Sequence, residues 1–299
     1  MEKFERKITD KIYSFNNAKE WSDLITIVRE LNIILQKNEQ EDHFNLSLLK
    51  EKISLSKRLA QCLNPSLPGG VHEVTLRSYE MILDNIIKYK ENDKSLGEDL
   101  PLYASGLFPF FQNATAQNKQ KYLNDIIKSK FLQLNATELE LILPGLLASI
   151  IPALEEQNDT NTKLIKDIFA NLREKVTPST FYGCLWSIII RNPHLRQASL
   201  KYLLEIVPSY KTFEELPENE RKEFKDTYFP KMSTLIINSL CVVIEDQDLQ
   251  TRRNAMDFLI KIFPINFSPP FYCFFSSIFC FFSFKFYLSL CFDCSPLFF

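Results

Sequence analysis

The sequence predicts an all-α protein, and three observations support this prediction. Only 6 of the 299 residues are Gly, while Leu, Ile, Lys and Glu are abundant, which favours helices over a β fold with many turns. Apolar residues recur at the three- and four-residue spacing of amphipathic helices, and no strand-like alternation persists. Because hydrophobic residues make up 45% of the chain, it can bury a core.

The clearest pair of helices lies on either side of a turn at residues 64–70. Pro interrupts the backbone hydrogen-bond ladder and Gly permits the turn, so we expect the second helix to begin at Val71. Lys50 and Lys57 fall on the polar face of the first helix. The predicted apolar stripes are Leu48, Leu55, Leu59, Cys62 and Leu63 before the turn, and Val71, Tyr79, Ile82, Leu83, Ile86 and Tyr89 after it.

Residues 139–154 are apolar nearly all the way round a helix, so we expect this segment to be buried between neighbouring helices. Pro144 and Pro152 should break or kink it, because Pro has no backbone N–H to donate. The segment is therefore predicted to be a core element interrupted at its two Pro residues.

Two later helices have clear start signals. Thr177 and Asn192 each precede a Pro that suits the first helical position, so both side chains are predicted to cap helices. The second of these helices should bury Leu195, Ala198, Tyr202, Leu203 and Ile206. The remaining expectations are helices over residues 179–190, 194–207, 230–245 and 249–263, and a polar loop over residues 209–223.

Roughly ten to twelve helices joined by short turns, each apolar on one broad face, favour antiparallel helix pairs stacked as an α-solenoid. Such an array is typical of HEAT and armadillo proteins. No clean period is visible in the sequence, so spacing alone does not assign a repeat family. An irregular all-α bundle is the alternative.

The composition changes sharply after Ile265, and we divide the chain there into a helical domain, residues 1–265, and a tail, residues 266–299. The tail holds 12 of the 26 Phe and 4 of the 7 Cys, but only two charged residues, Lys285 and Asp293, and no Gly. It is therefore a low-complexity, Phe-rich segment.

Three interpretations of this tail compete. Residues 271–292 are long enough for a membrane-spanning helix, although Lys285 inside the span would cost about 2.5–3.5 kcal/mol. Cys291 and Cys294 form a lone Cys-x-x-Cys pair, which is a weak pattern for a metal or redox site. We favour a non-native segment, because Phe, Ser, Leu, Cys and Pro all have pyrimidine-rich codons, as in an intron translated after the last true exon.

The charge of the chain disfavours some classes of partner. A formal net charge of −2 and a pI of about 6.0 give no strong field to attract nucleic acid, or an anionic membrane over the whole surface. Residues 1–10 are charged and lack the apolar stretch of a signal peptide, so we expect a cytosolic protein with reduced thiols. We therefore interpret the five Asn-x-Ser/Thr sequences as chance occurrences, at Asn45, Asn113, Asn135, Asn158 and Asn266.

No catalytic chemistry is visible. The chain lacks the motifs of nucleotide-binding loops, nucleophile elbows and zinc proteases, and its three His residues lack metal-ligand spacing. We therefore predict no enzyme activity, cofactor or metal. His72 is interpreted as a polar residue of a first helical turn, and the residues expected to pack in the core are Trp21, Cys62, Cys184, Trp186 and Cys241.

One basic surface is a candidate contact. Lys50, Lys57 and Arg58, continued by Arg77, are interpreted as a site for a partner protein or a lipid phosphate. The simpler alternative is a solvated helix face.

Several segments resemble the N-terminal region of the Dopey family. Residues 53–72, with the sequence ISLSKRLAQCLNPSLPGGVH, closely resemble its N-terminal signature. Further matching segments follow in the family's order, at residues 99–109, 146–156, 181–186 and 239–260. The resemblance ends after Ile265, whereas Dopey proteins are far longer, which implies that this chain is a piece of a larger scaffold.

The resemblance implies a non-enzymatic scaffold or adaptor in vesicle-mediated protein transport between endosomes and the trans-Golgi network. The implied partners are a large Sec7-related scaffold protein, a phospholipid flippase and phosphoinositide membrane. The implied location is the cytosol, with peripheral attachment to Golgi, trans-Golgi network and endosome membranes. The alternative function is a short helical interaction protein anchored in a membrane by the apolar tail.

Overall fold

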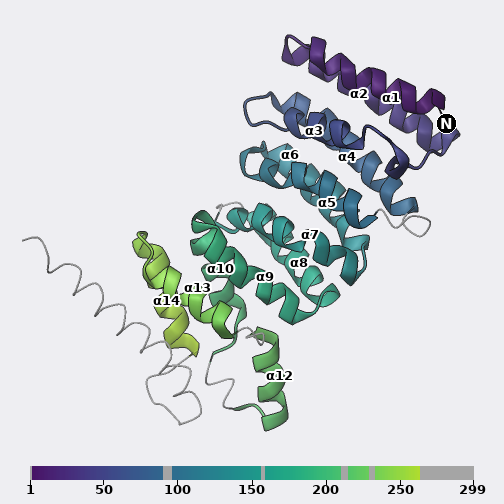
Figure 1. Cartoon of the computed structure of the whole chain (residues 1–299). Helices are drawn as coiled ribbons and strands as arrows, with labels where there is room; N and C mark the ends of the chain where they lie inside the picture. The colour runs from purple at the N-terminus through teal and green to yellow at the C-terminus, as the bar shows by residue number, and fades with distance from the viewer. Residues whose placement is uncertain (1, 90–95, 156–158, 210–214, 229–232, 263–299) are drawn as a thin grey trace, which may run out of the picture. The chain divides into compact units, whose positions relative to one another are not determined.

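The computed structural model describes residues 2–89, 96–155, 159–209, 215–228 and 233–262, which form helices joined by turns with no strand among them (Figure 1). The predicted all-α fold is confirmed. The helices belong to two compact units, Met1–Cys184 and Leu185–Phe299. The Phe-rich tail, residues 266–299, lies outside the described residues, so each interpretation of it stays a prediction.

The first unit is a succession of helices linked by short 3-10 or π-helical turns. Its α-helices are α1 (Glu2–Ser14), α2 (Trp21–Lys37), α3 (Lys52–Cys62), α4 (Gly69–Tyr89), α5 (Leu96–Leu107), α6 (Ala116–Lys121), α7 (Ala136–Ile150) and α8 (Asp159–Lys175), and α9 (Pro178–Arg191) continues into the second unit. The shorter elements are η1 (Phe15–Asn17), η2 (Asn38–Asp42), η3 (Leu46–Leu48), η4 (Phe108–Asn113), η5 (Tyr122–Lys128), η6 (Phe131–Gln133) and η7 (Ile151–Leu154).

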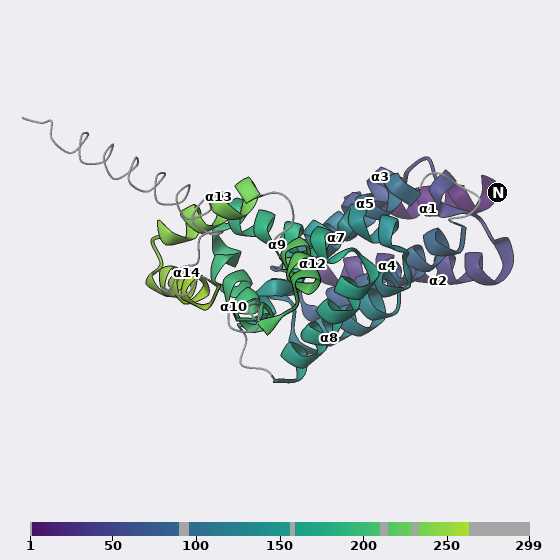
Figure 2. The same ribbon diagram turned by 90° about the horizontal axis from the view of Figure 1, so that it is seen from below.

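Within the first unit the helices stack in two layers. In one layer α1, α3, α5 and α7 pack against one another in turn, and in the other α2, α4, η5 and α8 do the same. Figure 2 shows α1, α3, α5 and α7 along one row and α2, α4 and α8 along the other. Because short turns join consecutive helices, these form antiparallel pairs, and stacking the pairs gives the predicted solenoid arrangement.

Hydrogen bonds between neighbouring helix pairs indicate a structural repeat, although the sequence shows no clean period. The Asn32 side chain donates to the Val74 carbonyl at 2.9 Å, across 42 residues. The Lys52 ammonium donates to Asp99 Oδ1 at 2.7 Å, across 47 residues. Residues about 40–50 positions apart therefore occupy equivalent places in successive pairs, as in HEAT and armadillo repeats.

The apolar stripes predicted around the turn at residues 64–70 are mostly buried in the core of the first unit. Leu48 is the main exception, with 60% of its surface exposed. The prediction failed there because α3 begins only at Lys52, so Leu48 belongs to the separate turn η3 and not to the helical stripe. Tyr89 is half-buried, and its hydroxyl donates to the His43 carbonyl at 2.8 Å.

α7 is a core helix, as predicted, but it does not end at Pro144. Both Pro144 and Glu140 are exposed, so the carbonyl that Pro144 leaves without a helical partner faces solvent. The helix ends at Ile150, and Pro152 lies in the 3-10 turn that follows. Ala136–Leu154 is the one stretch among the described residues long and apolar enough to span a membrane, and more than half of it is buried in the protein, as expected for a core helix.

The second unit contains η8 (Pro193–Leu195), α10 (Arg196–Ile206), α12 (Glu218–Tyr228), α13 (Ser233–Ile244) and α14 (Leu249–Ile262). α10 and α13 both pack against α14. Trp186 is fully buried and meets the edge of Phe258 with ring centroids 5.5 Å apart. In the same unit, Arg196 forms an ion pair with Asp246 at 2.6 Å.

Two predictions for the last third of the chain were wrong. The polar segment at residues 209–223 was expected to be a loop. It is helical from Glu218, where α12 begins. Asn192 makes no side-chain cap, since a 3-10 turn, η8, precedes α10. Thr177 does cap α9 as predicted, because its hydroxyl accepts a hydrogen bond from the Thr180 amide at 3.2 Å.

Candidate functional site

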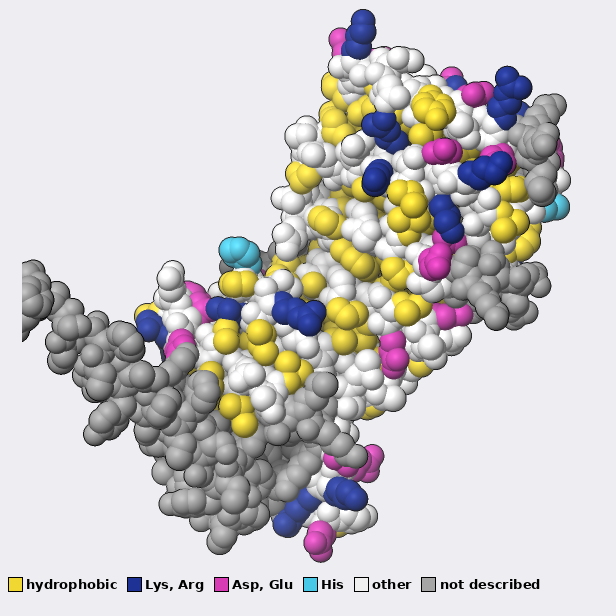
Figure 3. Space-filling model, in the orientation of Figure 1, with side chains coloured by type: hydrophobic (Ala, Val, Ile, Leu, Met, Phe, Trp, Pro, Cys, Tyr) yellow, Lys and Arg dark blue, Asp and Glu magenta, His cyan; other side chains and the backbone are white. Residues whose placement is uncertain are grey.

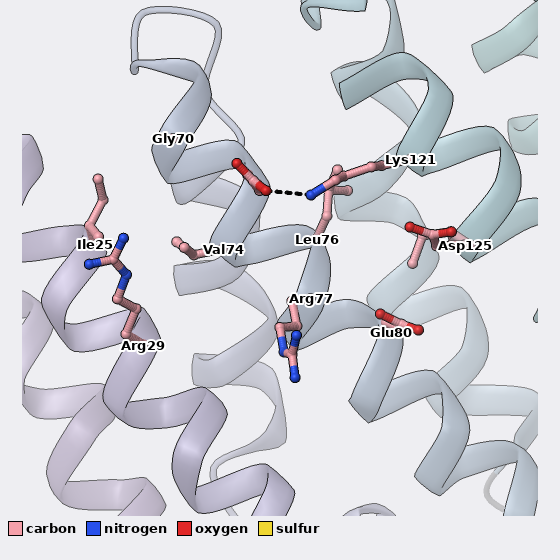
Figure 4. Close-up of a pocket in the computed structure, with 11 residues that line it drawn as sticks. Ile25, Arg29, Gly70, Val74, Leu76, Arg77, Glu80, Lys121 and Asp125 are labelled. Carbon is pink, nitrogen blue, oxygen red and sulfur yellow. Dashed lines mark hydrogen bonds and ion pairs between the residues drawn. The ribbon is translucent and has the colours of Figure 1, made fainter. Parts of the chain in front are cut away.

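A groove opens on the first unit between α2, α4 and the segment formed by α6 and η5 (Figure 4). Its cavity volume is about 370 Å³. Its apolar lining comes from Ile25, Val74, Leu76 and Ile126. Its charged lining comes from Arg29, Glu73, Arg77, Glu80, Lys121 and Asp125.

Helical spacing places the groove residues of α2 on one face. Ile25 and Arg29 are four residues apart, so they lie one turn apart, and Trp21 lies one turn further back. Trp21 is 53% exposed, which corrects the expectation that it packs in the core. It is the first residue of α2, next to the capping residue Glu20, where the helix end projects into solvent.

The core of the first unit holds the apolar part of the groove in place. Ile25 and Val74 are partly buried and pack against a core cluster formed by Phe15, Val28, Cys62 and Val71. Gly70 is the second residue of α4, and a Cβ added there would be 3.6 Å from Ile25 Cδ1 of α2. The absence of a side chain at Gly70 therefore keeps the space beside Ile25 open.

One ion pair crosses the groove, between the Lys121 ammonium and the Glu73 carboxylate, as the dashed line in Figure 4 marks. Arg29 and Arg77 are exposed, and neither makes an ion pair or a side-chain hydrogen bond with the residues that the structure describes. The groove therefore presents two cations that are free to bind an anionic group.

The opposite side of the groove is acidic. Figure 4 shows Glu80 of α4 and Asp125 of η5 facing each other. Burial raises the pKa of the Glu80 carboxyl above its ordinary value, and the Asp125 and Asp84 carboxylates raise it further, while Lys130 and Arg77 oppose the shift. The Lys130 ammonium forms an ion pair with Asp84 Oδ1 at 2.6 Å, so its charge does not fully neutralise the Glu80 carboxylate.

The structure does not gather the predicted basic residues into one site. Arg77 lines the groove, whereas Lys50, Lys57 and Arg58 belong to α3 and the turn before it, and none of these three lines it. Lys50 and Lys57 are exposed, and Arg58 donates hydrogen bonds to Gln61 Oε1 at 3.1 Å and to Asn16 Oδ1. The role of these residues in binding a partner or a lipid phosphate stays a prediction.

Charges of both signs are mixed on the molecular face shown in Figure 3. Basic and acidic side chains alternate there, with hydrophobic side chains exposed between them. This face therefore offers no continuous basic surface of the kind that binds nucleic acid.

Two chemically versatile residues have structural roles. His72 is buried, and its Nε2 forms a 2.9 Å hydrogen bond with the Asn64 carbonyl, which ties α4 to the turn before it. His72 thus lies in the first turn of α4, as predicted, and it is buried there. Burial raises the pKa of the Cys62 thiol to about 11, so it stays protonated at neutral pH. No group of three possible metal ligands occurs among the residues described.

The charged groove residues that sequence reasoning missed are Arg29, Glu73, Glu80, Lys121 and Asp125. Each lies in an ordinary polar stretch of its own helix, and the groove assembles them from positions about one repeat apart. Lys121 and its partner Glu73, for example, are 48 residues apart. Only a known repeat length would have aligned them.

The layered helix pairs define an α-helical repeat protein with a mixed-charge groove on its first unit. Residues 1–273 match the family described as Dopey, N-terminal, and the chain therefore belongs to the Dopey family.

Its relatives are much longer proteins. Protein DOP1B of Xenopus laevis is 30% identical over 259 residues, which is 87% of this chain and 10% of that protein. Protein pad-1 of Caenorhabditis elegans is 28% identical over 264 residues, which is 88% of this chain and 10% of that protein. The chain thus spans about a tenth of the length of these relatives. No solved structure matches it.

Proposed function

We propose that the chain is part of a non-enzymatic scaffold in vesicle-mediated protein transport between endosomes and the trans-Golgi network. Its membership of the Dopey family is the observation that carries the proposal. The proposed partners are a large Sec7-related scaffold protein and a phospholipid flippase. The proposed location is the cytosol, with peripheral attachment to phosphoinositide-containing membranes of the Golgi, trans-Golgi network and endosomes.

The fold supports this proposal physically. Stacked helix pairs bury one face of each helix and leave the other available, so the array offers a long surface to partners. The described residues contribute exposed aromatic and aliphatic side chains to that surface, such as Trp21, Ile53 and Leu141. Such a protein works by holding partners together, which needs contact surfaces and no reacting groups.

The proposal is tested on the endogenous protein in cells. We expect a tagged version to lie on trans-Golgi and endosome membranes, and its acute depletion to slow the return of a recycling cargo from endosomes to the Golgi. Alkaline carbonate should release the protein from membranes, as for any peripheral protein. Unchanged cargo return after depletion would contradict the proposed function.

A further inference from the structure

Two cations, Arg29 and Arg77, and two carboxylates, Glu80 and Asp125, line the groove between α2, α4 and η5 without forming an ion pair among the described residues. Arg29 of α2 and Arg77 of α4 lie on either side of Val74, and Glu80 and Asp125 face each other towards η5 (Figure 4). The Glu80 and Asp125 carboxylates face each other in a partly buried groove, which is unfavourable until a positive charge neutralises them, and the two Arg side chains make no ion pair among the described residues. Each side of the groove therefore favours a ligand group of the opposite sign.

The groove also offers apolar anchoring. Ile25 and Val74 pack against the core, so they present a firm surface and need little ordering when a ligand binds. Trp21 is exposed one turn beyond Ile25 on the same helix. Trp and Arg are the residue types that most often dominate the binding energy of protein interfaces.

The charge balance decides which class of ligand fits. The lining carries three cations, Arg29, Arg77 and Lys121, and three carboxylates, Glu73, Glu80 and Asp125. A polyanion such as a nucleic acid, or a strongly anionic membrane, would be repelled by the carboxylates. A peptide segment can carry an acid, a base and an apolar side chain in one turn, so it matches all three features of the groove.

We propose that the groove between α2, α4 and η5 binds an amphipathic peptide segment of a partner protein. The segment places an acidic side chain against Arg29 and Arg77, a basic side chain against Glu80 and Asp125, and an apolar side chain on Ile25 and Val74. Trp21 covers one end of the bound segment. This inference rests on the proposed scaffold function and deepens it by naming the contact surface and the chemistry of the partner.

The test uses the full purified chain and a library of short random peptides. Peptides selected on the wild-type chain are measured by fluorescence polarisation on three variants. We expect the selected peptides to combine apolar, acidic and basic residues. The variant R29E/R77E should weaken binding by about tenfold or more. The control R252E/R253E, at two exposed positions of α14, changes the charge equally outside the groove and should leave binding unchanged. W21A should weaken binding in part.

A charge swap distinguishes the loss of the charge contact from the loss of the fold in R29E/R77E. A peptide whose acidic residue is changed to Lys should lose affinity for the wild-type chain and regain it on R29E/R77E. Selected peptides that lack an acidic residue, or bind R29E/R77E as tightly as wild type, would overturn the proposal. So would a selection that enriches no peptide, or groove-dependent binding only to a second copy of this chain or to anionic vesicles. Because the measurement uses purified protein, its failure is distinct from a failure of the cellular transport assay.

Discussion

At the scale of single residues, Gly106 shows how closely adjacent helices approach. A Cβ added there would lie 2.5 Å from the hydroxyl of Tyr79 and 2.9 Å from the Cβ of Ala60. Tyr79 is fully buried and has little room to move. Gly106 is therefore the point at which α5 rests on α3 and α4.

We expect Gly106→Ala to lower the free energy of unfolding by about 1–3 kcal/mol, because it overpacks this crossing. Urea unfolding followed by circular dichroism measures the change. Gly97→Ala in the same helix is the control, because nothing lies within 4 Å of its Cβ position. It should stabilise the protein by about 0.5–1 kcal/mol through the better helix propensity of Ala. Equal stability of the two variants would show that the crossing is not tight.

The buried side chain of Asn32 joins two helix pairs. Its Nδ2 donates to the Val74 carbonyl at 2.9 Å, and its Oδ1 accepts from the Ser78 hydroxyl at 2.6 Å. Asn32→Ala should cost about 1–3 kcal/mol, because Ser78 would keep a buried hydroxyl with one partner fewer. Asn171→Ala, at an exposed position, should change the stability by less than about 0.5 kcal/mol in the same assay. A loss of equal size in both variants would contradict this role of Asn32.

Glu80→Gln should make the stability of the protein less dependent on pH. Folding raises the pKa of Glu80, chiefly through burial, so the folded state holds a proton that the unfolded chain releases. The free energy of unfolding of the wild type therefore falls as the pH rises from the ordinary pKa to the raised one. The variant lacks this loss, so it should be the more stable protein above that interval.

The advantage of Glu80→Gln over the wild type should shrink as the pH falls through the interval. Urea unfolding of both proteins at a series of pH values measures it. A stability difference that stays constant across the series would mean that the Glu80 carboxyl keeps its ordinary pKa in the folded protein.

At the scale of elements, α7 depends on its first turn. The Asn135 side chain accepts a hydrogen bond from the Glu138 amide at 3.0 Å, and Glu138 Oε2 accepts one from the Asn135 amide at 2.9 Å. Asn135→Ala should lower the stability by about 0.5–2 kcal/mol, because the first turn loses its cap. Asn135→Asp keeps the acceptor and should be close to wild type in thermal unfolding. If both variants unfold at the same lowered temperature, the cap is not what stabilises α7.

Sequence reasoning predicted most helices because their apolar stripes are regular, but it missed α12. This helix has no apolar stripe to reveal it, and its charge pattern is local: Glu218 and Glu220 lie in the first turn, where the helix dipole favours acids. The prediction that Leu48 is buried was wrong for a different reason. Leu48 fits the apolar period of α3 but precedes the start of that helix. The apolar period therefore predicted the buried faces of the helices better than it predicted where the helices begin and end.

At the scale of the whole molecule, the groove could not be read from the sequence. Arg77 was predicted as a contact residue, but its neighbour Arg29 comes from the preceding repeat, and the sequence shows no period that would align the two. Trp21 was expected in the core because its segment is apolar, yet it begins α2 and is exposed. Stacking of the helix pairs brings these residues together. The sequence predicted that the pairs stack, but not which residues of successive pairs lie side by side.

The central claim is that a protein of the Dopey family binds a transport partner through this groove. The most direct test replaces the endogenous protein by the full-length protein that carries R29E/R77E, and measures the return of a recycling cargo from endosomes to the trans-Golgi network. R252E/R253E, at two exposed positions of α14, is the matched control. We predict slowed return with R29E/R77E and normal return with R252E/R253E. Normal return with R29E/R77E, at wild-type protein levels, would contradict the claim.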